Sequence, residues 1–138
     1  AKGLLLACIA DPDPCILLEA MRCYFVPGLV PEQSYKIPLG RAAVLRPGTD
    51  LTIISWSWAV QEALTAAEAL AAEGIEAEVI DLRTLVPLDM ATVLQSVART
   101  GRALIVHAAV EFGGFGAELA ARIQEAAWGK LRAPVARL

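Results

Sequence analysis

The stretch "AEVIDLRTLVPLDMATVLQSVARTGRALIVHAAV", residues 77–110, contains two apolar runs with a helical segment between them. The runs at 77–85 and 103–110 are rich in Val, Ile and Leu, which favours strands buried on both faces. Between them, Asp89 is placed to cap a helix that Gly101 ends. The stretch therefore predicts a strand, a helix and a second strand, joined by short connections.

The same alternation continues on both sides of this stretch. Residues 58–74 repeat apolar side chains with helical spacing and end at Gly74, and residues 117–131 predict another helix. Further strands are expected at 51–57 and 133–138. Because strands and helices alternate, we expect an α/β fold with a mostly parallel, five-stranded sheet and helices on both of its faces.

One strand should break the parallel pattern. "AAVL", residues 42–45, is separated from the strand at 51–57 only by "RPGTD", residues 46–50. A connection of this length is too short for a parallel crossover, so we expect these two strands to pair antiparallel with each other. The strand at 42–45 would then be an edge of the sheet.

The first forty residues do not share this pattern. Residues 1–11 have the composition of a helix, and "PCILLEAMRCYF", residues 14–25, begins with an apolar run that predicts a strand. About 25 residues cannot bury a core alone, so we expect residues 1–25 to be the end of a preceding domain. Residues 26–40 contain three prolines and two glycines, which is typical of an extended linker.

Composition argues against several kinds of partner. The net charge is -3 and Lys and Arg do not cluster, so we expect no nucleic-acid binding. No apolar run reaches the roughly 18 residues of a membrane span, and no signal segment opens the chain. We expect a cytoplasmic protein of a bacterium, with the mitochondrial matrix as the alternative. Three cysteines without a CxxC pair and a single histidine do not make a metal site.

A glycine-rich loop, "GGFG", lies between a predicted strand and the start of a predicted helix. Backbone N–H groups and the helix dipole favour an anion there. However, the spacing of Gly113, Gly114 and Gly116 around Phe115 matches neither common phosphate-binding motif, and acidic residues lie on both sides of the loop. We therefore expect a tight turn or a contact surface in place of a phosphate site.

Three further residues are candidates for a site at the carboxyl ends of the strands, where open α/β sheets bind ligands. His107 ends one predicted strand, but no neighbouring nucleophile is available, so we expect a packed or interface histidine. Trp56 and Trp58 end another strand and would point to the same face if the chain is extended there. They could stack on a ligand, although packing is the more common use.

These features together resemble the β subunit of the E1 component of 2-oxo acid dehydrogenase complexes. The resemblance covers the whole chain, and its most specific segments are "EAEVIDLRTLVPLD" at 76–89 and "GGFGAELAARI" at 113–123. The linker "VPEQSYKIPLG" at 30–40 favours this family over transketolases. It departs from the family at Ala108, where relatives commonly carry a glutamate.

The resemblance implies a division of the chain and a parent enzyme. Residues 1–25 would end a pyrimidine-binding domain, 26–40 would be a linker, and 41–138 would form a transketolase C-terminal-like domain, a three-layer α/β/α sandwich with one antiparallel edge strand. The parent would be an α2β2 enzyme that uses thiamine diphosphate and Mg²⁺ to decarboxylate a 2-oxo acid, or to cleave acetoin, and passes an acyl group to the lipoyl arm of E2.

The family's catalytic and cofactor-binding residues have no counterpart in these 138 residues. The resemblance therefore implies that this chain binds no cofactor, is inactive alone, and serves association with an E1 α subunit, a second β subunit and possible contact with E2. The alternative that the residues leave open is a free-standing α/β module that binds a small organic anion near Trp56, His107 and Gly113.

Overall fold

The computed structural model describes residues 1–138 and contains one five-stranded sheet with the order β1-β3-β2-β4-β5. The strand bounds are β1 Ala43–Arg46, β2 Leu51–Ser55, β3 Ala77–Asp81, β4 Ala103–Val106 and β5 Ala136–Arg137. Strands β2 to β5 pair parallel, whereas β1 is antiparallel and lies at one edge. The expected mostly parallel sheet with one antiparallel edge strand is confirmed.

The expected partner of that edge strand was wrong. β1 pairs with β3 and not with β2, with Val44 opposite Ile80. The connection between β1 and β2 is tied to the beginning of β3: the Thr49 and Asp50 amides both donate to the Glu76 carbonyl, and the Glu76 amide donates to Asp50 Oδ2 at 2.8 Å. The connection thus passes around the end of β3, which lies between β1 and β2.

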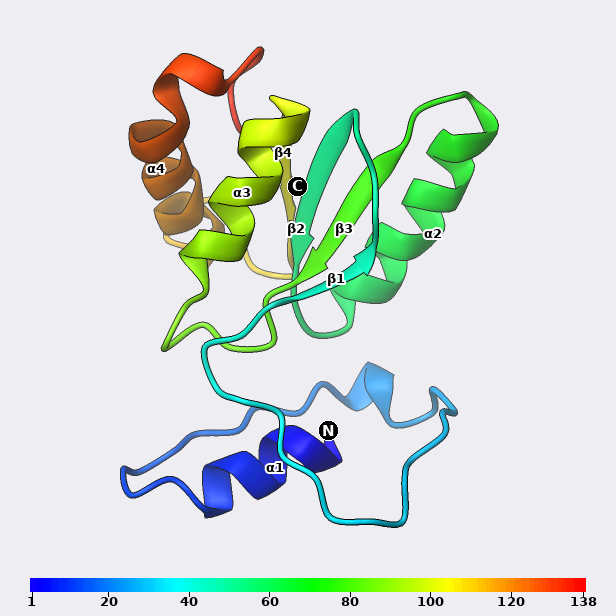
Figure 1. Cartoon of the computed structure of the whole chain (residues 1–138), viewed down its shortest axis with the longest axis vertical. Coiled ribbons are helices and arrows are strands. Elements are labelled where there is room, and N and C mark those ends of the chain that lie inside the picture. Colours follow the sequence, from blue (N-terminus) through cyan, green and yellow to red (C-terminus); the bar gives the residue numbers. More distant parts are fainter.

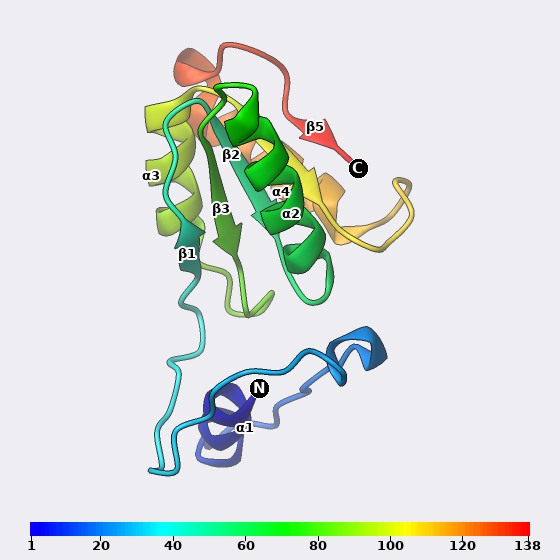
Figure 2. The same ribbon diagram turned by 90° about the vertical axis from the view of Figure 1, so that its right-hand side faces the viewer.

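Three helices cover the sheet in two layers (Figures 1 and 2). Their bounds are α2 Ala59–Ala72, α3 Met90–Thr100 and α4 Phe115–Ala127, and a short 3-10 helix, η2, Trp128–Lys130, follows α4. α2 packs with Ile53 and Val79 on one face, while α3 and α4 pack with Ile54 and Ile80 on the other. The α/β/α sandwich expected from the family resemblance is therefore present.

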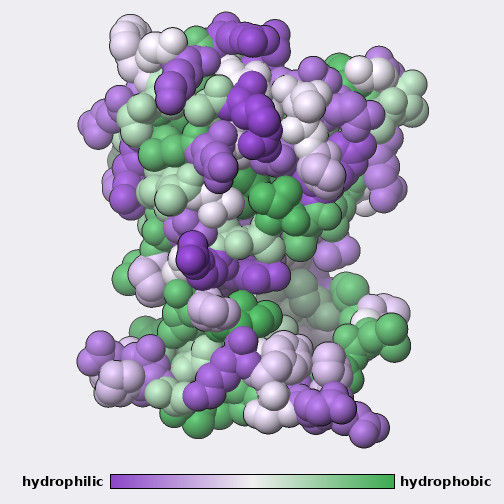
Figure 3. All heavy atoms as spheres, in the orientation of Figure 1, coloured by the Kyte–Doolittle hydropathy of each residue, from purple (hydrophilic) through white to green (hydrophobic).

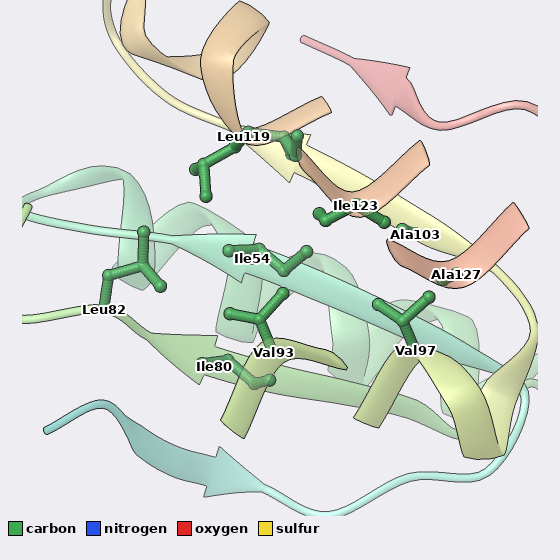
Figure 4. Close-up of a cluster of buried hydrophobic side chains, with 10 residues drawn as sticks. Ile54, Ile80, Leu82, Val93, Val97, Ala103, Leu119, Ile123 and Ala127 are labelled. Carbon is green, nitrogen blue, oxygen red and sulfur yellow. The ribbon is translucent and has the colours of Figure 1, made fainter. Parts of the chain in front are cut away.

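The larger part of the core lies beneath α3 and α4. Figure 4 shows how its aliphatic side chains point toward one another from the sheet and from the two helices. Ile54 and Ile80 from the strands and Val93, Val97 and Ile123 from the helices are fully buried. Burial of each such side chain stabilises the fold by roughly 1.5–3 kcal/mol before the entropy of ordering is counted.

The bounds predicted for α3 are confirmed. Asp89 Oδ1 accepts the Thr92 amide at 3.1 Å, and Gly101 ends the helix with φ +70°. Asp89 Oδ2 also accepts the Ala42 amide at 3.1 Å, so one side chain joins α3 to the segment that leads into β1. Although burial opposes ionisation, the Thr92 and Ala42 hydrogen bonds and the charge of Arg41 hold the pKa of Asp89 below its ordinary value.

Residues 1–40 lie beside the carboxyl ends of the strands and contain α1, Lys2–Ile9, and a 3-10 helix, η1, Met21–Cys23 (Figure 1). The helix predicted at 1–11 is confirmed, but the strand predicted within 14–25 was wrong. Ile16 and Leu18 are 89% and 86% exposed and have no strand beside them. An apolar run forms a strand only where another strand supplies hydrogen bonds.

α1 is held by the linker that follows it. The Ile37 amide donates to the Gly3 carbonyl at 3.0 Å, and Tyr35 packs so closely on Gly3 that a Cβ there would meet its ring. Lys2 Nζ donates to three linker carbonyls, those of Pro31, Glu32 and Gln33. No helix of the structure has the length and apolar character needed to cross a membrane.

Candidate functional site

A hollow of about 350 Å³ opens at the carboxyl ends of β2, β3 and β4. Figure 3 shows the narrowing of the molecule at this level, between the sheet and residues 1–40. The hollow brings together four of the residues singled out in the sequence, Trp56, Trp58, His107 and Phe115. Its other lining residues are Ser57, Leu85, Ala108 and Ala109.

The hollow lies where the chain changes direction across the sheet. β2 and β4 are parallel neighbours, with Ser55 opposite Val106. The chain leaves β2 toward α2 on one face and leaves β4 toward α4 on the other face. The two connections therefore separate, and a crevice forms between them at the point where doubly wound sheets generally bind ligands.

Three aromatic rings form one wall of the hollow. Trp56 and His107 stack with ring centroids 4.8 Å apart and planes 15° from parallel. Phe115 meets Trp56 edge-on, with centroids 5.9 Å apart. Such offset and T-shaped pairs contribute about 0.5–1.5 kcal/mol beyond the area they bury. The packed histidine expected from the sequence is thus part of an aromatic cluster in which Trp56 contacts both other rings.

The glycines of the loop make room for His107. A Cβ on Gly116 would lie 2.7 Å from His107 Cδ2 and closer still to Nε2, and a Cβ on Gly114 would lie 2.9 Å from Cε1. Gly113 has φ +76°, a conformation that favours glycine, and open space around it. The "GGFG" segment is therefore a tight turn that receives an imidazole.

His107 is also fixed by hydrogen bonds. Its Nδ1 accepts the Ala109 amide at 3.2 Å, which places the ring proton of the neutral form on Nε2. Its own amide donates to the Leu138 carbonyl at 3.1 Å. Burial lowers the pKa of His107, and the positive charge of Arg137 lowers it further. The histidine is a neutral, packed side chain at pH 7.

The loop residues do not fit a diphosphate and its magnesium ion. The imidazole occupies the space beside Gly114 and Gly116 that a phosphate cradle would keep open. Glu111 and Glu118 stand before and after the turn, and Glu111 pairs with Arg137 at 3.4 Å. No three His, Cys, Asp or Glu side chains gather anywhere in the chain to ligate a cation.

Sequence reasoning missed one residue that contacts the lining of this site. Arg22 of η1 places its guanidinium 4.4 Å from the centroid of the Trp58 ring, a cation–π contact between residues 1–40 and the sheet. The two residues are far apart in the chain, and no spacing rule joins them.

Comparison with known proteins agrees with the fold. The family described as "Transketolase, C-terminal domain" matches residues 40–138, and the chain belongs to that family. A solved structure titled "Split gene transketolase, inactive beta4 tetramer" superposes with a TM-score of 0.62 and 31% identity, covering 74% of this chain and 32% of that one.

Matches among curated proteins extend over the whole chain and agree with the resemblance to E1 β subunits. The chain is 48% identical to the pyruvate dehydrogenase E1 component subunit beta of Bacillus subtilis, covering 100% of this chain and 43% of that protein. It is 46% identical to the beta subunit of acetoin:2,6-dichlorophenolindophenol oxidoreductase of Cupriavidus necator, covering 97% and 40%. It is 42% identical to the 2-oxoisovalerate dehydrogenase subunit beta of Pseudomonas aeruginosa, covering 100% and 43%. The chain spans about two fifths of the length of these relatives.

Proposed function

We propose that this chain is the non-catalytic, C-terminal part of an E1 β subunit and that it serves subunit association. Residues 1–25 would be the end of the pyrimidine-binding domain, and 26–40 would be a linker. Residues 41–138 would be the transketolase C-terminal-like domain, through which the subunits associate. The observation that carries the proposal is the match over the whole chain to β subunits of three related enzymes. The parent would act in the cytoplasm on a 2-oxo acid or acetoin.

The exposed apolar side chains support the association role. Val110 and Phe112, in the loop before α4, are 74% and 95% exposed. Exposed large apolar side chains that lie close together are typical of interface residues. We call residues 110–112 the loop tip. The solved neighbour is described as an inactive β4 tetramer, which supports both association and the lack of activity.

A second apolar region lies on residues 1–40, at the lower end of the molecule in Figure 3. Its most exposed members are Ile16, Leu18, Met21, Phe25 and Leu29. In the proposed parent these side chains would be covered by the rest of the pyrimidine-binding domain. The partners would be an E1 α subunit and a second β subunit, with thiamine diphosphate and Mg²⁺ held outside this chain and the acyl group passed to E2.

The inactivity of this chain has a direct test. We expect no release of carbon dioxide from pyruvate or 2-oxoisovalerate when the purified chain is given thiamine diphosphate and Mg²⁺, because no acid side chain here is placed to activate the cofactor. The assay should include an intact E1 enzyme as a positive control. Turnover by the chain alone, retained after repeated purification, would overturn the assignment.

A further inference from the structure

We propose that the hollow at the carboxyl ends of β2 and β4 binds a small aromatic carboxylate, with its ring against Trp58 and Phe115 and its carboxylate on Arg22. The site lies within residues 1–138 and does not depend on the association proposed above. Failure of one proposal therefore leaves the other standing.

The position and size of the hollow suit a small ligand. It lies at the switch point of the sheet, between connections that leave toward opposite faces. Its volume of about 350 Å³ falls at the lower end of the range of roughly 300–1,000 Å³ found for small-molecule sites. A ligand with a single ring and a short polar group matches this volume.

The backbone at the end of β2 directs both tryptophans into the hollow. Ser57, between them, has φ +60°, a left-handed conformation that costs a non-glycine residue of order 1 kcal/mol or more. The sequence predicted that Trp56 and Trp58 point to the same face if the chain is extended there. The chain instead turns at Ser57, and both rings still line the hollow. Trp56 is covered by His107 and Phe115, whereas Trp58 has Arg22 over one face of its ring and still lines the hollow. A ligand would contact the part of the Trp58 ring that Arg22 leaves free.

The charge beside the hollow favours an anion: Arg22 is not itself a lining residue, but its guanidinium lies against the lining residue Trp58. No Asp or Glu lines the hollow, so a cationic ligand would have no carboxylate to pair with. Arg22 already lies over Trp58, and the ion pairs of the chain involve Arg46, Arg99 and Arg137 but not Arg22. An exposed guanidinium without a carboxylate partner, above an aromatic ring, offers a carboxylate two parallel N–H donors.

The test is a titration followed by the indole N–H signals in proton–nitrogen correlation spectra of the full chain. The chain has three tryptophans, and Trp128 lies in η2, after the far end of α4. With phenylacetate as the probe, we expect the Trp56 and Trp58 signals to move saturably at millimolar concentrations while the Trp128 signal stays. Signals that all move alike without saturation, or that do not move, overturn the site.

A neutral probe and one substitution test the role of Arg22. Phenylacetamide has the same ring without the charge, so we expect it to bind about three- to tenfold more weakly than phenylacetate. Arg22→Gln should remove this preference, whereas Arg122→Gln, an exposed residue of α4 that does not line the hollow, should keep it. Equal affinity for both probes, an unchanged preference in Arg22→Gln, or tighter binding of a choline probe contradicts the proposal.

A second substitution tests the ring. Trp58→Ala should weaken phenylacetate binding about fivefold or more, because the phenyl ring loses the aromatic ring on which it stacks. Unchanged Trp56 and Trp128 signals in the free variant would show that it is folded. A folded Trp58→Ala variant that binds phenylacetate like the parent chain overturns the assignment of the ring.

Discussion

The imidazole of His107 fills the space that a side chain on Gly116 would need. A Cβ on Gly116 would lie 2.7 Å from His107 Cδ2, a distance that packed atoms do not tolerate. The neighbouring ring of Trp56 prevents the imidazole from moving away without loss of the stacking. The histidine and the glycine loop are therefore one structural unit at the mouth of the hollow.

This relationship predicts the sign of a glycine substitution. Gly116 lies in the first turn of α4, where helix propensity alone would make Gly116→Ala stabilising by up to about 1 kcal/mol. The clash with His107 should instead destabilise the chain by about 1–3 kcal/mol. Urea unfolding measures the change in the free energy of unfolding.

The matched control is Gly129→Ala. Gly129 lies in η2, and a Cβ added to it would have no atom within 4 Å, so we expect a change of no more than about 0.5 kcal/mol. If Gly116→Ala is as stable as the Gly129→Ala control, His107 does not restrict Gly116.

The same histidine should make stability depend on pH. Because its pKa is lowered in the fold, the unfolded chain binds a proton first as the pH falls through the ordinary value of 6.5. The contribution of His107 is thus fully present above pH 6.5 and is lost below it. Thermal unfolding at pH 7.5 and 5.5 should show the parent chain less stable at the lower pH.

His107→Asn isolates this contribution. The Asn Oδ1 can accept the Ala109 amide as Nδ1 does, but the side chain does not titrate. We expect the variant to be less stable than the parent at pH 7.5, since the Trp56 stacking is lost, and to show a smaller loss between pH 7.5 and 5.5. An equal loss in both chains would assign the pH dependence to other groups.

Asp89 should stabilise the fold in two ways, as the cap of α3 and as the acceptor of the Ala42 amide. Asp89→Ala removes the cap of α3 and leaves the Ala42 amide without its acceptor, so we expect a loss of about 1–2 kcal/mol in the free energy of unfolding. Asp89→Asn keeps an oxygen for the Thr92 amide and should lose less. Because the pKa of Asp89 is lowered in the fold, its contribution is present above the ordinary value of 3.8 and is lost as the pH falls below it.

An Asn variant as unstable as the Ala variant would mean that the charge or the Oδ2 bond to the Ala42 amide, and not the Oδ1 bond to the Thr92 amide, carries the effect. Chemical unfolding at pH 7 compares the three chains directly. Repetition near pH 3 should bring the parent and Asp89→Asn closer together.

The parts of the fold governed by local patterns were predictable from the sequence. Asp89 and Gly101 bounded α3 because a cap and a left-handed turn are local events. The partner of β1 was not predictable from the short connection, since Asp50 and Glu76 meet only when β3 is in place. The strand within residues 14–25 failed for a similar reason, because strand formation depends on a neighbour.

The candidate site also has residues that the sequence predicted and contacts that it did not. Trp56 and His107 were recognisable because the carboxyl ends of neighbouring parallel strands meet at one edge of the sheet. The sequence did not show that Gly116 receives the imidazole, because that contact depends on the angle between β4 and α4. Arg22 could not be predicted as a neighbour of the site, because its contact with Trp58 joins two segments that are distant in the sequence.

Association through the loop tip is the central claim, and sedimentation velocity at rising protein concentration tests it most directly. We predict that the chain self-associates and that Phe112→Glu, which places a charge at a side chain that is 95% exposed and makes no part of the core, shifts it toward monomer. Trp128→Ala, at another exposed aromatic residue, should behave like the parent chain. A strictly monomeric parent at high concentration, or association unaffected by Phe112→Glu, would contradict the account.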